Sequence, residues 1–117
     1  MRAGILWVWA ILLGTGCYYD VEEKLYPNNC NAQNVSYQAV VLPILERECY
    51  SCHNTLTQNG DVNLEGYDRV FTWIENGELL AAIRHEGPFP MPKDAAKLDS
   101  CTIAKIETWI AGGALNN

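Results

Sequence analysis

Three neighbouring residues have the types and spacing to do chemistry: Cys49, Cys52 and His53, in the run Cys-Tyr-Ser-Cys-His. Two thiols three positions apart can reach the two vinyl groups of a haem and form thioethers with them. A histidine directly after the second thiol can bind the iron as its proximal ligand. The pattern therefore predicts one covalently attached haem c, with thioethers from Cys49 and Cys52 and an iron bond from His53.

Two other kinds of site use similar residues and remain alternatives. A structural zinc site built on the same three side chains usually brings a second ligand pair, whereas Cys30, Cys101 and His85 are isolated in the sequence. A thioredoxin-like dithiol needs a strand before it and a helix after it. No run of β-branched residues precedes Cys49, which counts against the dithiol.

An electron carrier needs a second iron ligand, and Met91 is the only methionine besides Met1. It lies in the run Pro-Phe-Pro-Met-Pro-Lys at 88–93, where the prolines favour a stiff, non-helical loop. A thioether opposite His53 would raise the reduction potential of the iron. We expect Met91 to be the distal ligand; the alternative is a side chain that fills a gap in the core.

Several other residues could lie near a haem. His85 could replace Met91 as a ligand and lower the potential, hydrogen-bond a propionate, or simply end a helix. Arg84 and Lys93 are candidate propionate partners, because a guanidinium or an ammonium attracts a carboxylate. Tyr67 and Trp73 could pack on the haem or donate to it, or belong to the ordinary core.

The first 16 residues predict a signal peptide: Arg2 is followed by an apolar run at 3–13 and by the small residues of 14–16. The run is shorter than the roughly 20 residues that a membrane-spanning helix needs. Cys17 follows directly, which is similar to a bacterial lipoprotein signal, although Gly14 stands where a branched apolar residue is usual. We expect Cys17 to carry a lipid anchor in the periplasm or cell envelope. The alternative is ordinary cleavage nearby, which leaves Cys17 as a thiol or as a disulfide partner.

Five cysteines are an odd number, which needs an explanation in an exported protein. With Cys17 assigned to lipid and Cys49 and Cys52 to haem, Cys30 and Cys101 remain. We expect these two to form a disulfide, which persists in an oxidising compartment. Closing a loop between residues 71 positions apart could contribute about 4 kcal/mol. The alternative is two buried free thiols.

The charge of the chain restricts its partners. Loss of residues 1–16 removes Arg2, one of eight basic side chains, and leaves seven against 14 acidic ones, a net charge of −7. Such a surface argues against nucleic acid binding. It favours redox protein partners with a basic docking face.

Residues 17–33 are polar and without periodicity, and we interpret them as a tether before one domain at 34–117. In the domain, apolar residues recur at three-to-four-residue spacing. Four stretches show this pattern: 40–49, 64–74, 79–83 and 103–110. Ser36 can cap an early turn, Pro43 suits a first turn, and Asp99 or Ser100 can cap the last helix. We predict an all-α fold of three to four helices around one covalently bound haem.

Together these features resemble the small class I cytochrome c domains of bacteria, particularly the lipoprotein versions. The resemblance covers roughly Cys30 to Asn117 and depends mainly on the haem motif and on Met91-Pro92-Lys93. It implies a mono-haem electron carrier rather than an enzyme, with His53 and Met91 on the iron. The alternative is a haem enzyme or small-ligand sensor in which Met91 is displaced.

The chain departs from that family at one position. Many class I cytochromes have a proline soon after the haem motif, whose carbonyl accepts the N–H of the proximal histidine. Here no proline occurs between His53 and Pro88. Since metal-binding histidines nearly always make such a contact, we expect another carbonyl in the 54–63 loop to orient the ring.

Overall fold

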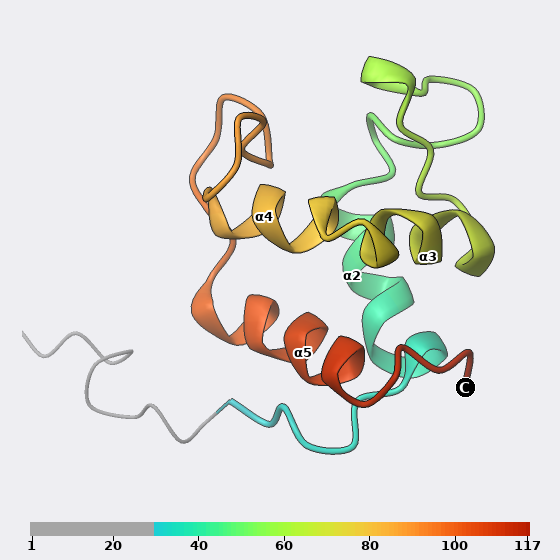
Figure 1. The fold of residues 1–117 in the computed structure, drawn as a ribbon, viewed down its shortest axis with the longest axis vertical. Helices are drawn as coiled ribbons and strands as arrows, with labels where there is room; N and C mark the ends of the chain where they lie inside the picture. Colours follow the sequence, from blue (N-terminus) through green and yellow to red (C-terminus); the bar gives the residue numbers. More distant parts are fainter. Residues whose placement is uncertain (1–29) are drawn as a thin grey trace, which may run out of the picture.

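A computed structural model describes residues 30–117 and confirms that this part of the chain is all-α, with helices and no strand. The predicted signal peptide, Cys17 and most of the predicted tether lie outside the described residues. The helical elements are η2 (Tyr37–Val41), α2 (Leu42–Glu48), η3 (Asn59–Asp61), α3 (Tyr67–Glu75), α4 (Glu78–Arg84) and α5 (Ser100–Ala111) (Figure 1). Within 30–117 no helix is long and apolar enough to cross a membrane.

The first predicted helical stretch consists of two elements. Ser36 caps η2, as predicted, since its Oγ accepts a hydrogen bond from the backbone N–H of Ala39 at 3.3 Å. Pro43 lies in the first turn of α2, also as predicted. Proline has no N–H to continue a regular ladder, and the wider π-type turns of η2 precede it.

The helix predicted to include Leu64 begins later, at Tyr67. Gly66 has a φ of 104°, a backbone conformation that a helix cannot contain, so Leu64 is buried as part of the preceding loop. Gly77, with a φ of 76°, then separates α3 from α4. The third predicted stretch is confirmed as α4.

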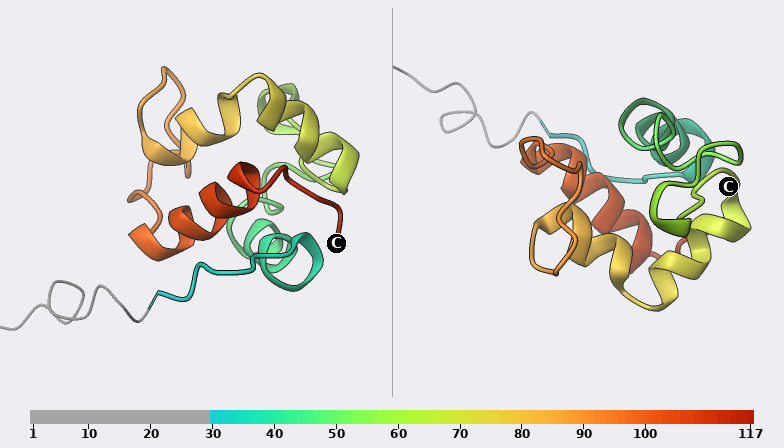
Figure 2. Two further views of the ribbon diagram at one scale, coloured as in Figure 1. Left: turned by 60° about the horizontal axis from the view of Figure 1, so that its bottom comes forward. Right: turned by 90° about the horizontal axis from the view of Figure 1, so that it is seen from above.

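Helix α5 is capped by Asp99, whose carboxylate accepts hydrogen bonds from the N–H and the hydroxyl of Thr102. These bonds hold the pKa of Asp99 below its usual value. Apolar residues on one face of α5, including Ile106 and Trp109, are buried against η2 and α4. Figure 2 shows α5 between these elements.

An aromatic cluster joins the two ends of the domain. The ring of Tyr37 stacks on Trp109 and meets the edge of Tyr67, with centroids 5.5 and 5.3 Å apart. Around it lies one core, formed by Tyr37, Val41, Ile44, Leu45, Leu64, Val70, Leu79, Ile83, Ile103, Ile106, Trp109 and Ala114. This core is the scaffold from which the loops after α2 and α4 extend.

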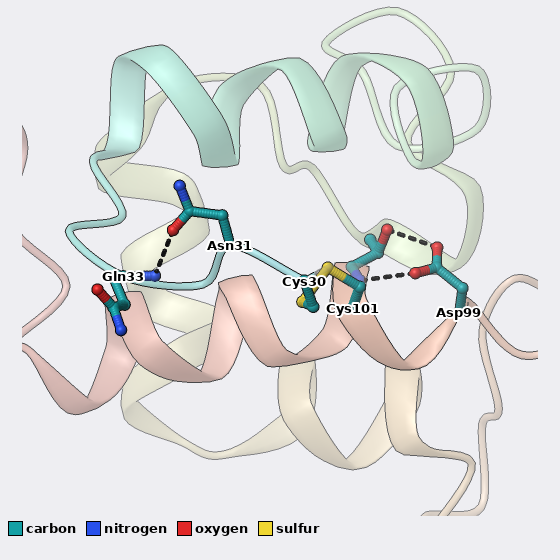
Figure 3. Close-up of a disulfide and its surroundings, with 6 residues drawn as sticks. Cys30, Asn31, Gln33, Asp99 and Cys101 are labelled. Atoms are coloured by element: carbon teal, nitrogen blue, oxygen red, sulfur yellow. Dashed lines mark hydrogen bonds between the residues drawn. A yellow bond between two sulfur atoms is a disulfide. The ribbon is translucent and has the colours of Figure 1, made fainter. Parts of the chain in front are cut away.

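The structure contains the disulfide between Cys30 and Cys101, with their Cα atoms 5.4 Å apart. Figure 3 shows this disulfide on the first turn of α5, beside the capping residue Asp99. It fastens the segment that leads from the N-terminal region onto the last helix. Two free cysteines remain among the described residues, Cys49 and Cys52.

Candidate haem site

The Cys-Tyr-Ser-Cys-His motif forms a compact turn at the C-terminal end of α2. The N–H groups of Cys52 and His53 both donate to the carbonyl of Cys49, at 3.2 and 3.0 Å. This turn places both thiols and the histidine within one short segment. Cys49 is half-buried and Cys52 is exposed.

Burial raises the pKa of the Cys49 thiol to about 11, and the nearby Glu48 carboxylate adds to the effect. Cys49 is therefore a protonated thiol at neutral pH. A redox-active dithiol depends on a thiolate. The environment of Cys49 therefore does not favour the dithiol alternative.

The ring of His53 is held by the carbonyl of Val62, 3.3 Å from its Nδ1. A carbonyl oxygen only accepts hydrogen bonds, so Nδ1 carries the proton in this contact. In the neutral ring, Nε2 then keeps its lone pair and can bind a metal. Val62 lies in the 54–63 loop, where a carbonyl partner for His53 was expected in place of the missing proline.

This loop is fastened to the motif by its backbone. The N–H of Asn59 donates to the carbonyl of Cys52 at 2.9 Å, and the N–H of Leu64 donates to the carbonyl of His53 at 2.8 Å. The side chain of Leu64 is buried in the core. The position of the Val62 carbonyl is therefore set by hydrogen bonds on both sides of it and by core packing.

Met91 lies on the loop after α4 and is half-buried. Its N–H donates to the carbonyl of Ala82 in the last turn of α4, at 3.0 Å. In Figure 1 this loop and the loop after His53 both extend from the side of the helices opposite α5. The loop that carries Met91 and the loop after His53 thus extend away from α5 in this view.

Three of the other candidate haem contacts have partners within the chain. Nε2 of His85 lies 2.9 Å from the carbonyl of Met91. Arg84 pairs with Glu107 at 2.7 Å, and the hydroxyl of Tyr67 donates to the carbonyl of Ala114 at 2.7 Å. These interactions give three of the side chains structural roles in the chain itself.

Trp73 is half-buried and borders a surface hollow together with Arg69 and residues of the 55–63 loop. A second hollow lies beside the start of α5. Neither is lined by the haem motif or by Met91. Lys93 is exposed.

The described residues include the side chains to which a haem c is attached. Between Cys30 and Asn117, no three His, Cys, Asp or Glu side chains are arranged to hold a metal. A haem c needs four attachments. The chain offers two free thiols, a histidine whose Nδ1 donates to a carbonyl, and a thioether on a separate loop. The residues present therefore fit the group that the motif predicts.

Comparison with family models, curated proteins and solved structures finds no match to this chain. The candidate site therefore depends on the motif and on the geometry around it.

Two functional groups could not be found from the sequence. They are the carbonyl of Val62, which orients His53, and the carbonyl of Ala82, which accepts from Met91. Every residue carries a backbone carbonyl, so residue type gives no signal for either. Only the folding of the two loops selects them.

Proposed function

We propose that the chain is a mono-haem c-type cytochrome of the class I fold, which carries single electrons and is not an enzyme. His53 and Met91 are its iron ligands, and Cys49 and Cys52 carry the thioethers. The observation that supports this most strongly is the hydrogen bond from Nδ1 of His53 to Val62, because it leaves Nε2 as the free nitrogen. A histidine in that tautomer next to two free thiols is suited to proximal ligation.

The bound haem would supply a one-electron ferric–ferrous couple. The role of the chain is to attach the haem and to position the iron ligands. The thiols of Cys49 and Cys52 would hold the haem as thioethers, each formed by adding S–H across a vinyl double bond, with sulfur on one carbon and hydrogen on the other. His53 would bind the iron through a ring fixed by the loop after it, and Met91 through a loop anchored on α4. No side chain acts as acid, base or nucleophile during electron transfer.

The proposed location is the periplasm or cell envelope, with Cys17 lipidated and the domain tethered to a membrane. The partners are redox proteins that meet an acidic surface with a basic face. Phe89, which lies in the Met91 loop and is 73% exposed, supplies apolar contact area for such a weak and transient complex.

Covalent haem is tested first. The full chain is expressed with a c-type maturation system, denatured, separated by electrophoresis and stained for haem. We expect staining in the wild type and its loss in the Cys49→Ser/Cys52→Ser double variant. A Cys30→Ser/Cys101→Ser variant, which changes the same number of cysteines, keeps the stain. A wild-type band without haem would contradict the proposed function and return zinc binding to consideration.

Ligation is tested by the optical spectrum of the ferric protein. We expect a low-spin spectrum with the far-red methionine–iron charge-transfer band, and loss of that band in Met91→Ala. A high-spin wild type, or one without the band, would favour the alternative of a haem enzyme or ligand sensor.

The anchor is tested by fractionation. Wild-type protein is expected in the membrane fraction and Cys17→Ser in the soluble fraction. Unchanged fractionation would contradict lipidation of Cys17 and leave the haem proposal untouched.

A further inference from the structure

Met91 has an unusual backbone environment because prolines lie on both sides of it. Pro90 and Pro92 have no N–H, so the N–H of Met91 is the only backbone donor in this three-residue stretch. It donates to the carbonyl of Ala82 at 3.0 Å. One of the two backbone polar groups of the ligand residue is therefore fastened to the last turn of α4.

The other polar group is fastened to the same turn by a side chain. The carbonyl of Met91 lies 2.9 Å from Nε2 of His85. His85 directly follows α4 and has a φ of 58°, in the left-handed region, and its own N–H donates to the carbonyl of Ala82 at 3.1 Å. Because a carbonyl only accepts, Nε2 of His85 is the donor. This nitrogen is then protonated and has no lone pair for iron.

We infer that His85 is a positioning residue for the axial ligand: its ring holds the peptide of Met91 against the end of α4. The inference rests on the proposed function, since it assigns His85 a role toward the iron through Met91. Because the N–H and the carbonyl of Met91 are both held, this residue loses less conformational freedom when its thioether binds iron than it would on a free loop. The Met91–iron bond therefore resists displacement by an added ligand more strongly than it would on a free loop.

The test is the titration of the ferric holoprotein with imidazole, which must displace Met91 before it binds. The variant is His85→Gly, because glycine accepts the left-handed backbone and removes the ring. Gln58→Gly is the matched control. Gln58 is also exposed and left-handed, with a φ of 38°, and its side chain donates to a backbone carbonyl at 2.8 Å, but it lies in the other loop.

We expect His85→Gly to lower the apparent dissociation constant of imidazole about fivefold, the usual effect of one lost hydrogen bond. Gln58→Gly should leave the constant near the wild-type value. His85→Gln, which keeps a side-chain N–H, should recover part of the difference. Gln58 shows that this chain holds a glutamine in the left-handed region.

Each failure has its own signature. A wild-type protein without covalent haem, or without the far-red band, overturns the proposed function or its ligation, and with it the role of His85. A wild type with both properties whose imidazole constant is unchanged in His85→Gly overturns the positioning role alone. An equal fall in His85→Gly and Gln58→Gly also overturns it, because general loosening would then explain the effect.

Discussion

His53 and His85 each donate a ring N–H to a backbone carbonyl, but they do so through opposite nitrogens. The proton of His53 is on Nδ1, so in the neutral ring the lone pair is on Nε2. The proton of His85 is on Nε2, so in the neutral ring the lone pair is on Nδ1. The comparison shows that the position of one backbone carbonyl decides which ring nitrogen of a histidine is protonated. It is the basis for proposing His53 as the ligand and His85 as the positioning residue.

The loop after His53 and the loop that carries Met91 also differ, in the contacts that hold them to the helices. The loop after His53 is fastened by several backbone hydrogen bonds and by the buried side chain of Leu64. The loop with Met91 contains prolines, which cannot donate, and Met91 itself is held by two contacts with the end of α4. We therefore expect the His53 loop to be fixed by the core and the Met91 loop by its anchor residues.

The largest expected effect separates the two histidines. His53→Ala should abolish the low-spin ferric spectrum, because the proximal ligand is lost, whereas His85→Gly should retain it. Both are measured by absorption spectroscopy of the purified holoprotein. A low-spin His53→Ala protein together with a high-spin His85→Gly protein would reverse the two assignments.

The next effect concerns the packing beneath the His53 loop. Leu64 is 5% exposed, so Leu64→Ala leaves a cavity and should lower the free energy of unfolding by about 2–4 kcal/mol. Leu56, which is 95% exposed in the same loop, is the matched control. Leu56→Ala should change the free energy of unfolding by less than about 0.5 kcal/mol. Urea denaturation of both variants gives the comparison. Equal effects would contradict the idea that the core fixes this loop.

A smaller effect separates the two thiols in chain produced without haem. With a pKa of about 11 rather than the usual 9.0, the thiolate fraction of Cys49 at neutral pH is about 100-fold below that of an ordinary thiol. Iodoacetamide should therefore label the exposed Cys52 first and reach Cys49 as the pH rises toward 11. Mass spectrometry of the labelled peptides follows the order. Equal labelling at pH 7 would show that Cys49 is not buried in this turn.

The smallest effect lies in the core that carries both loops. The hydroxyl of Tyr37 is buried without a hydrogen-bond partner, so Tyr37→Phe should be neutral or stabilise the fold by up to about 1 kcal/mol at pH 7. Burial, and then the nearby Tyr50, raise the pKa of Tyr37 from 10.0 to about 12. The folded chain thus holds this proton more tightly than the unfolded chain does.

The stability that depends on neutral Tyr37 is therefore complete below pH 10 and is lost as pH rises from 10 to 12. Tyr37→Phe should flatten this part of the stability profile, measured by urea midpoints across that range. The far-red band at pH 7 should stay unchanged. A change in the band would mean that the core tyrosine influences the Met91 loop directly.

Most of the fold could be predicted from local patterns. Ser36 and Asp99 cap helices where the sequence indicates, and the last apolar stripe is α5. The periodicity predicts the wrong element for Leu64, because it contains no information on the backbone of Gly66, whose φ of 104° excludes a helix before Tyr67. The periodicity also does not predict that η2 and α2 are separate elements, because both bury residues on the same face.

The sequence by itself determined the chemical groups: two thiols and a histidine in one turn, a single methionine between prolines, and two further cysteines. Residue type and short-range spacing are sufficient for that. The tertiary structure alone decided how those groups are directed. It placed the Val62 carbonyl at Nδ1 of His53 and the Met91 carbonyl at Nε2 of His85. Backbone carbonyls are identical in every residue, so only the folded path of the chain can choose among them.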